Sequence, residues 1–382
     1  MFKDHNESYE QIREAVKRLC ASFPGEYWRQ QDSDSRYPTE FVQALVDTGY
    51  LAVLVPEEYG GSGHDLKAAC IILETIHETG CNGAACHAQM YTMGTLLRHG
   101  SDTQKQRWLP GIADGTLRLQ AFGVTEPDSG TDTTRITTTA VRDGDNYVVN
   151  GQKIWTSRAG HSDLMVLLAR TASRDTVPKP TQGLSVFMVD LREEIDHSIK
   201  ITPIETMINH STNSVFFDDL KVPVENLIGN EGEGFSYILD GMNAERILIG
   251  AECIGDARFL VQRAAAYANE REVFGRPIGQ NQGIQFPIAE AHIQTEAAAL
   301  MVEKAATSFD EGRPCGTEAN MAKLLASEAS WKAADVCMQT LGGFAFALEH
   351  DVERKFRETR LYRIAPVSTN LILSHVGTHV LG

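Results

Sequence analysis

The chain has 382 residues, of which 42% are hydrophobic, enough for a large buried core and about two or three domains. Its 35 basic and 51 acidic residues give a formal net charge of -16, which argues against nucleic acid or an anionic membrane as the main partner. An anionic ligand would therefore need a local basic site. Because there is no signal-like apolar stretch near the N-terminus and no run of roughly 20 apolar residues, we expect a cytoplasmic protein.

The seven cysteines are scattered along apolar helical stretches, and their number is odd. We therefore expect reduced, buried thiols rather than a disulfide framework. Cys81, Cys86 and His87 come closest to the spacing of metal ligands, but no second ligand pair follows, so we expect no zinc site.

The first part of the chain, to about residue 116, has helical periodicity. Apolar residues recur on one helical face between Ile12 and Phe23, and the pattern returns after Pro38. The glycine-rich loop Pro56–Gly63 precedes a helix that starts near Asp65 and ends near Gly80. Ser101 and Gln104 then form a capping box for a further helix. These features predict an N-terminal helical domain.

From about Leu117 the apolar period changes from 3.6 to 2, which indicates strands. Asn150-Gly151 is a typical hairpin pair, so we expect a turn there. The pattern predicts a small antiparallel β domain that ends near Leu227. The candidate strands are Leu117–Val124, Thr137–Arg142, Tyr147–Val149, Lys153–Thr156, Leu164–Ala169, Ser185–Val189, Ile199–Pro203 and Ser214–Phe217.

After Gly234 the helical period returns and continues to the C-terminus. Four long stretches, separated by linkers that contain glycine and proline, predict a helical bundle. The fold class is α+β, mainly α, with predicted domains at residues 1–116, 117–227 and 228–382. The four stretches are roughly Phe235–Arg271, Gly283–Phe309, Thr317–Thr340 and Ala365–Val380.

Two short segments of the β region are suited to binding a ligand. Ala121–Asp132 reads AFGVTEPDSGTD, and its hydroxyls and flexible N–H groups after Pro127 are suited to binding ligand oxygens. Asn150–Ser157 reads NGQKIWTS and adds an aromatic wall, Trp155. Each segment alone is more often a plain turn or a core strand, but together they match a longer pattern.

In these segments the chain closely resembles the acyl-CoA dehydrogenase family. That family has a V-T-E-P-x-x-G-[ST]-D segment and a K-x-W-x-[TS] segment, here Val124–Asp132 and Lys153–Ser157. The order of helical, β and helical regions also agrees, so the resemblance covers about Glu10 to Gly382. It implies the acyl-CoA dehydrogenase fold, with a C-terminal four-helix bundle, and an FAD cofactor.

A candidate base lies on the helix that starts near Phe235. Ile238, Met242, Glu245 and Ile249 share one face, which places a carboxylate in an apolar stripe. Burial either raises the pKa of such a group or requires a partner, for which Arg246 is the alternative. We prefer the base. The isovaleryl- and long-chain-type branches of the family place their catalytic Glu on this helix in an E-R-L pattern.

The loop that carries the catalytic Glu in most members of the family differs here. Matching Leu361–Ile364 to the family's I-Y-x-I puts Pro366 where that Glu would be, so no carboxylate is available. The family also uses the backbone N–H at this position to hold the thioester carbonyl, and proline has none. Loss of one such donor costs about 3 kcal/mol of barrier unless another donor replaces it.

The resemblance also implies the ligand-binding residues. Thr131, Asn243 and Arg246 match positions that contact coenzyme A. The family builds its cofactor site from two subunits, with the Q-x-x-G-G segment, here Gln339–Gly343, contributed by the neighbouring subunit. The FAD positions are Phe122, Val124, Thr125, Trp155, Ser157, Arg271, Phe274, Gln282, Gln339, Gly342, Gly343, Ser368 and Asn370.

The implied reaction is α,β-dehydrogenation of an acyl-CoA to a trans-2-enoyl-CoA. Glu245 removes the α-proton, and the β-hydrogen leaves as hydride to the flavin. An electron-transferring flavoprotein then accepts the electrons, and a homotetramer, or at minimum a dimer, is implied. Pro366 favours an alternative, a relative with diverged chemistry such as a desulfinase or a monooxygenase. A third hypothesis is a regulatory protein that binds acyl-CoA or FAD. The sequence does not predict the length or branching of the acyl chain.

Overall fold

A computed structural model describes the backbone of residues 2–382 and the side chains from residue 8 onward. The chain forms two compact units. The first comprises the chain up to Ser35, Asp65–His87 and Asn243–Gly382; the second comprises Arg36–His64 and Ala88–Met242. Two helices continue from one unit into the other: α5 (Ala84–His99) and α7 (Gly234–Glu270).

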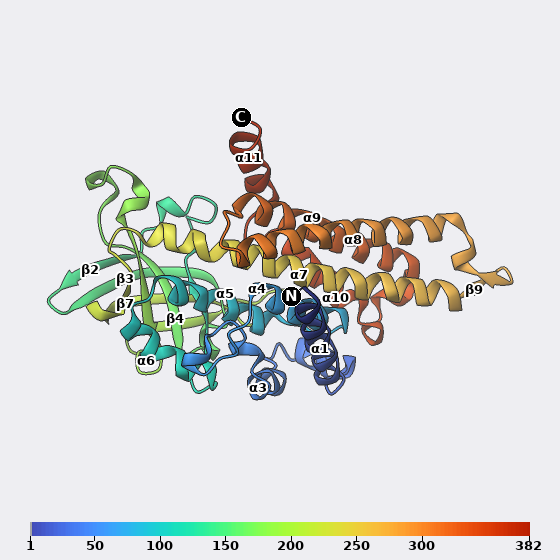
Figure 1. Cartoon of the computed structure of the whole chain (residues 1–382), viewed down its shortest axis with the longest axis horizontal. Helices are drawn as coiled ribbons and strands as arrows, with labels where there is room; N and C mark the ends of the chain where they lie inside the picture. Colours follow the sequence, from blue (N-terminus) through green and yellow to red (C-terminus); the bar gives the residue numbers. More distant parts are fainter. Residues whose placement is uncertain (1) are drawn as a thin grey trace. The chain divides into compact units, whose positions relative to one another are not determined.

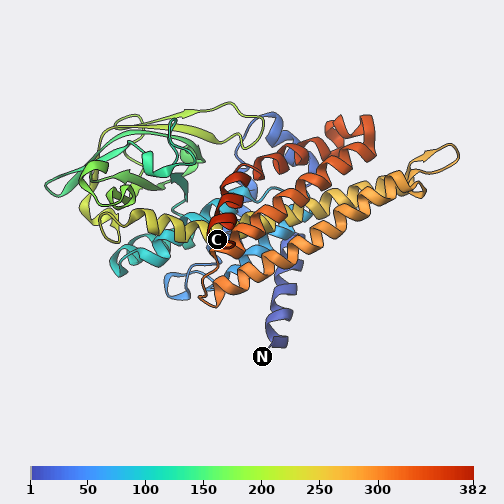
Figure 2. The ribbon, with the colours of Figure 1, turned by 90° about the horizontal axis from the view of Figure 1, so that it is seen from above.

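The first unit is helical. Its long helices α7, α8 and α9 lie side by side, and a short hairpin of β9 (Glu272–Val273) and β10 (Arg276–Pro277) joins α7 to α8 (Figures 1 and 2). Besides α7, the helices of this unit are α1 (Phe2–Cys20), α2 (Gly25–Ser33), α4 (Leu66–Glu78), α8 (Gln282–Asp310), α9 (Gly316–Leu341), α10 (Val352–Tyr362) and α11 (Thr369–His379).

The helix α4 begins and ends at the residues that the sequence indicated. The Asp65 carboxylate accepts the Ala68 N–H and so caps the start of α4. Gly80 follows the end of α4 with a φ of 84°, a left-handed conformation that glycine adopts without strain.

The predicted helix at Ala365–Val380 is present as α11, but the structure has an additional helix, α10, that the sequence pattern did not predict. Both α10 and α11 contact α9. The helix α10 was missed because its buried face is charged: Arg354, Lys355 and Glu358 are buried together with Val352 and Tyr362. A search for an apolar period cannot detect such a face.

The second unit contains the β domain and the helices α3 (Thr39–Asp47) and α6 (Asp102–Ala113), the latter started by the predicted Ser101–Gln104 capping box. Its sheet has the strand order β6-β7-β3-β2-β4-β5-β8, with β1 paired to β4. The strands are β1 (Leu119–Gly123), β2 (Thr139–Asp143), β3 (Asn146–Ser157), β4 (Leu164–Arg170), β5 (Leu184–Asp190), β6 (Ile199–Pro203), β7 (Thr212–Pro223) and β8 (Leu227–Ile228).

Two predictions about the sheet were wrong. The sheet is mixed rather than antiparallel, because β1 runs parallel to β4. Asn150-Gly151 is not a hairpin either, since β3 runs straight through it with a bulge next to Gly151, and the β2–β3 turn lies at Gly144. At Gly151, with φ 148°, a Cβ would lie 2.5 Å from Thr138 Oγ1, so the glycine allows a close strand approach.

Separate apolar clusters form the cores. Met165, Leu167 and Phe187 lie in a cluster on one side of the sheet, and Leu164, Val166 and Val186 lie in a second cluster that includes Trp108 of α6. In the first unit a further cluster joins α7, α8, α9 and α10. All seven cysteines are free thiols and buried, as predicted. Within residues 2–382, no helix is both long enough and apolar enough to cross a membrane.

Candidate active site

The segments Ala121–Asp132 and Asn150–Ser157, here called the cradle, meet in the second unit. Lys153 of β3 reaches across to the first segment, where its Nζ donates to the Val124 carbonyl at 3.0 Å and to Glu126 Oε1 at 2.8 Å. The Ile154 N–H donates to the Thr125 carbonyl at 2.9 Å. The structure thus brings together the two segments that the sequence singled out.

The ion pair of Lys153 and Glu126 is buried, and both groups are mainly ionised at neutral pH. Burial alone would raise the pKa of Glu126, but the Lys153 ammonium and the N–H of Thr137 hold that pKa at about 2. Burial outweighs the pull of Glu126 on Lys153 and lowers the pKa of the lysine to about 8, which still leaves the ammonium charged at pH 7. The pair therefore fixes the turn that begins at Glu126.

Trp155 has an unusual backbone for a strand residue. The pairing of β3 with β7 shifts register between Lys153 and Thr156, and Trp155 has a φ of 59°. A non-glycine residue in this left-handed region costs on the order of 1 kcal/mol, and such residues cluster at ligand sites. The indole is 56% exposed. The bulge thus directs a large aromatic ring outward, which suits it to stack on a flat ligand.

The remaining cradle residues are also placed by these contacts. Phe122 is half-buried on β1 and meets the Tyr91 ring edge-on, with centroids 5.4 Å apart. The Ser157 hydroxyl accepts a hydrogen bond from the Asn209 amide at 2.9 Å. Thr131 is exposed beyond the turn, in which the Ser129 hydroxyl donates to the Asp132 carbonyl.

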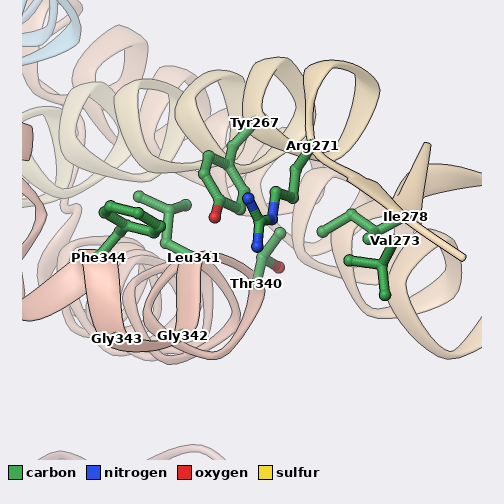
Figure 3. A pocket seen from close by; sticks show the side chains of 9 residues that line it. All are labelled: Tyr267, Arg271, Val273, Ile278, Thr340, Leu341, Gly342, Gly343 and Phe344. Carbon is green, nitrogen blue, oxygen red and sulfur yellow. The ribbon is translucent and has the colours of Figure 1, made fainter. Parts of the chain in front are cut away.

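A second candidate site is a pocket of about 500 Å³ in the first unit, between the end of α7 and the end of α9 (Figure 3). Arg271 and Tyr267 extend from the α7 side toward Thr340 and Phe344. The pocket is lined by Tyr267, Arg271, Val273, Ile278, Thr340, Leu341, Gly342, Gly343 and Phe344.

The chemistry of this pocket suits a phosphate-bearing ligand. The Arg271 guanidinium makes no hydrogen bond or ion pair with any described residue, so its donors are available to an anion. A Cβ built on Gly342 or Gly343 would meet no atom within 4 Å, and Gly342 has a φ of 60°. A ligand can therefore approach the backbone closely, as a diphosphate requires.

The resemblance assigned the glycine pair to the neighbouring subunit's share of the FAD site, and in the structure this pair and Arg271 line one pocket of a single chain. Phe274 is fully exposed in the β9–β10 turn, Gln282 begins α8, and Gln339 is exposed near the end of α9. Ser368 caps α11, where its hydroxyl accepts the Leu371 N–H at 3.4 Å, and Asn370 is exposed in the first turn.

Glu245 is buried in the middle of α7, as its place in the apolar stripe predicted, and only 8% of its surface is exposed. Among the residues that the structure describes, its carboxylate has no hydrogen bond and no ion pair. Burial raises the pKa of Glu245 to about 8, and the nearby carboxylate of Glu252 adds to the shift, whereas Arg246 and Lys323 oppose it. Such a group is a usable general base near neutral pH.

The alternative in which Arg246 neutralises Glu245 is not found. The guanidinium of Arg246 hydrogen-bonds to Asn320 Oδ1 of α9 at 3.1 Å instead. Asp240, a second carboxylate of α7 with which Arg246 could have paired, lies 3.2 Å from His99 instead. Asn243 is half-buried one turn before Arg246, and the Cβ position of Gly316 lies 3.7 Å from its Oδ1.

The loop between α10 and α11 holds Pro366 and, as predicted, offers no carboxylate from Arg363 to Ser368. The buried Lys323 of α9 holds this loop, because its Nζ donates to the Val367 carbonyl at 2.8 Å. The N–H of Val367 makes no hydrogen bond within residues 2–382. A free backbone donor thus lies directly after Pro366.

Sequence reasoning gave no role to several residues around these sites. Glu126 and Lys153 lie inside the quoted motifs, and their position there was the only available signal. Glu252 and Lys323 are charged residues in long apolar helices, a pattern that indicates burial but not which groups surround them. Their neighbours, such as His77 and Val367, come from distant parts of the chain.

Comparison with known proteins agrees with the motifs. Family models described as the N-terminal, middle and C-terminal domains of acyl-CoA dehydrogenase match residues 6–116, 121–220 and 232–381. The chain is 35% identical to acyl-CoA dehydrogenase fadE12 of Mycobacterium bovis over 382 residues, 99% of this chain and 97% of that protein.

Solved structures show the same similarity. The glutaryl-coenzyme A dehydrogenase in complex with glutaryl-CoA is 31% identical, with a TM-score of 0.91 and coverage of 98% of this chain and 95% of that chain. A chain from the structure of an electron transferring flavoprotein of Acidaminococcus fermentans is 29% identical, with a TM-score of 0.92 and 98% coverage of both chains. The chain therefore belongs to the acyl-CoA dehydrogenase family of FAD-dependent oxidoreductases.

Proposed function

We propose that this protein dehydrogenates an acyl-CoA thioester to its trans-2-enoyl-CoA and that Glu245 is the base. The observation that carries the proposal is the buried carboxylate of Glu245, whose pKa is raised to about 8 and which has no partner in the described chain. The α-hydrogen of a thioester is weakly acidic, so a base with a raised pKa matches it better than an ordinary carboxylate. A purely structural carboxylate would be expected to have a partner.

FAD fits the residues that would hold it. Arg271, Gly342 and Gly343 would bind its diphosphate, and Phe274, Gln282 and Gln339 would contact the remainder of the adenosine end. Phe122, Val124, Thr125, Trp155 and Ser157 would hold the flavin ring, with Ser368 and Asn370 nearby. When bound, FAD supplies the acceptor for the two electrons and the hydrogen that leave the β-carbon.

The CoA portion would be bound by Thr131, Asn243 and Arg246. Arg246 is held by Asn320, so its orientation is fixed before a ligand arrives. The thioester oxygen gains negative charge when Glu245 removes the α-proton, and it needs hydrogen-bond donors. The N–H of Val367 offers one beside Pro366, in place of the N–H that proline lacks.

The proposal extends to the partners and the setting. The electron acceptor would be an electron-transferring flavoprotein. The protein would act in the cytoplasm, in lipid metabolism. A homotetramer, or at minimum a dimer, is supported by apolar side chains that the chain leaves exposed. Phe286, Ile293 and Leu300 recur every seven residues along α8 and are 51%, 65% and 69% exposed, and Phe274 is fully exposed.

The direct test is anaerobic reduction of the bound FAD by a panel of acyl-CoAs that vary in chain length and branching. We expect at least one of them to bleach the flavin absorbance and to yield the 2-enoyl-CoA. If no acyl-CoA bleaches the flavin, the dehydrogenase proposal fails.

The alternative reading is diverged chemistry of the desulfinase or monooxygenase type, and the lack of a carboxylate in the loop of Pro366 favours it. The same experiment distinguishes the two. A flavin that stays oxidised with every acyl-CoA under anaerobic conditions, but turns over with oxygen and an external reductant, would support the alternative.

A further inference from the structure

Two buried cysteines from distant parts of the chain meet in the first unit. Cys20 is the last residue of α1, and Cys81, 61 residues later, follows the end of α4. The two thiols hydrogen-bond to each other. The Cys81 Sγ also lies 3.9 Å from the Cys20 carbonyl oxygen and 3.6 Å from the Phe23 carbonyl oxygen. Thiols in direct contact need only small side-chain movements to reach the geometry of a disulfide.

The backbone that carries Cys81 is held by α10. The Lys355 Nζ donates to the Cys81 carbonyl at 2.6 Å, and the preceding residue, Arg354, donates to the Gly80 carbonyl at 2.9 Å. Lys355 is itself fully buried and donates to Asp256 of α7 at 2.7 Å. Contacts from two other helices therefore fix the position of Cys81 against the second thiol, and they place a cation next to it.

These surroundings favour the thiolate on Cys81 rather than on Cys20. The hydrogen bond with the Cys20 thiol lowers the pKa of Cys81, and the Trp28 indole and the Lys355 ammonium lower it further, against the effect of burial. The same hydrogen bond, together with burial, raises the pKa of Cys20. Because the thiolate is the nucleophilic form of cysteine, Cys81 is the better nucleophile of the two.

We propose that Cys20 and Cys81 form a redox pair, in which the Cys81 thiolate reacts with a hydroperoxide and Cys20 converts the product to a disulfide. With hydrogen peroxide, the Cys81 sulfur attacks one oxygen, the O–O bond breaks, hydroxide leaves, and Cys81 becomes a sulfenic acid. The Cys20 sulfur then attacks the Cys81 sulfur, and the sulfenic oxygen leaves as water. In total, two thiols are oxidised to one disulfide and the peroxide is reduced to two waters.

Burial of the pair selects a small oxidant. Only 3% of Cys20 and 1% of Cys81 is exposed. Hydrogen peroxide is close to water in size, whereas oxidised glutathione must bring its own sulfur, within a much larger molecule, against the attacking thiolate. We therefore expect the folded protein to react with the peroxide and not with oxidised glutathione.

The test is treatment of the full-length, FAD-loaded protein with hydrogen peroxide. The remaining thiols are then alkylated in denaturant, and the peptides are mapped by mass spectrometry without reduction. We expect a disulfide between Cys20 and Cys81 that dithiothreitol removes. The matched control Cys70→Ala, which lacks a different buried thiol of α4, should form the same disulfide, whereas Cys20→Ala and Cys81→Ala should not.

The single variants also test the two roles. In Cys20→Ala the sulfenic acid of Cys81 has no second thiol to react with, so dimedone added with the denaturant should label Cys81. In Cys81→Ala the same treatment should leave Cys20 unlabelled. A label on Cys20 and none on Cys81 would overturn the assignment of the nucleophile.

The wild-type protein alone decides the main claim, whether or not the variants fold. Thiols that all stay free after peroxide treatment would overturn it, and so would a disulfide from either cysteine to a different partner. An equal yield of the disulfide with oxidised glutathione would overturn the selection of a small oxidant.

Stability gives a second readout. A disulfide between residues 61 positions apart restricts the unfolded chain, so the oxidised protein should unfold at a higher urea concentration than the reduced protein. An equal or lower midpoint would mean that the two thiols are not placed for a disulfide. None of these measurements uses an acyl-CoA, so they test the redox pair independently of the proposed function.

Discussion

The order of the cradle depends on Lys153 more than on any other single residue. It is fully buried, and it satisfies both the Val124 carbonyl and the Glu126 carboxylate. Removing one partner of such a pair leaves a buried charge without compensation, which costs more than the pair itself contributes.

We therefore expect Lys153→Met to destabilise the protein by about 3 to 5 kcal/mol in urea unfolding and to weaken retention of FAD. The control is Lys200→Met, an exposed lysine of β6 in the same sheet. If Lys153→Met were as stable as the control, Lys153 would not hold the cradle.

The same pair predicts a pH dependence. The folded protein lowers the pKa of Glu126 from 4.5 to about 2, so the stabilisation is complete above pH 4.5 and is lost as the pH falls toward 2. In urea titrations the wild type should lose stability over this window, whereas Lys153→Met should lose less. An equal loss in both proteins would place the acid sensitivity elsewhere.

At the scale of elements, the strand β3 has two irregularities that serve the site. The bulge at Gly151 brings the strand close to Thr138 next to the cradle, and the register shift before Thr156 turns Trp155 outward. In a regular strand, successive side chains point to opposite faces of the sheet, and the direction of the Trp155 side chain would follow from that alternation alone.

Gly151→Ala tests the first irregularity. The added Cβ would lie 2.6 Å from Thr138 Cα, so the backbone must shift, and we expect a loss of about 3 kcal/mol in urea unfolding. Gly144→Ala, also at positive φ but with no atom within 4 Å, should lose only about 1 kcal/mol. Equal losses in the two variants would show that backbone conformation alone accounts for the effect.

These elements also show what the sequence can and cannot predict. Alternating apolar residues predicted most strands, and the motifs predicted the cradle, because both signals are local. The Asn150-Gly151 pair predicted a hairpin, since the close approach of Thr138 is not visible in sequence. The helix α10 was missed because its charged residues Arg354 and Lys355 are buried among partners from α7 and from the segment that follows α4. The surroundings of Glu245 depend in the same way on α9 and on the loop at Val367.

At the scale of the whole molecule, the exposed apolar residues of α8 bear on the proposed assembly. Ile293 and Leu300 lie two turns apart on one face, with Phe286 two turns before them. We expect the double variant Ile293→Asp, Leu300→Asp to form a smaller species by light scattering and to lose FAD, because a second copy is proposed to complete the cofactor site. Val141→Asp, an exposed apolar residue of β2, is the control.

Either of two results would contradict the proposed assembly through α8. An unchanged mass would mean that α8 is not the contact between copies. Dissociation with full retention of FAD would mean that one chain holds the cofactor by itself, through the pocket that Arg271 shares with Gly342.

The central claim is that Glu245 is the base, and rapid anaerobic mixing of FAD-loaded Glu245→Gln with an acyl-CoA that reduces the wild type tests it most directly. Glutamine has nearly the same size and cannot accept the α-proton. We predict that the variant retains FAD and binds the acyl-CoA but reduces the flavin at least about 1,000-fold more slowly. The control Glu303→Gln, the same change at an exposed glutamate of α8, should behave as the wild type. Flavin reduction at the wild-type rate in Glu245→Gln would contradict the account and place the base elsewhere.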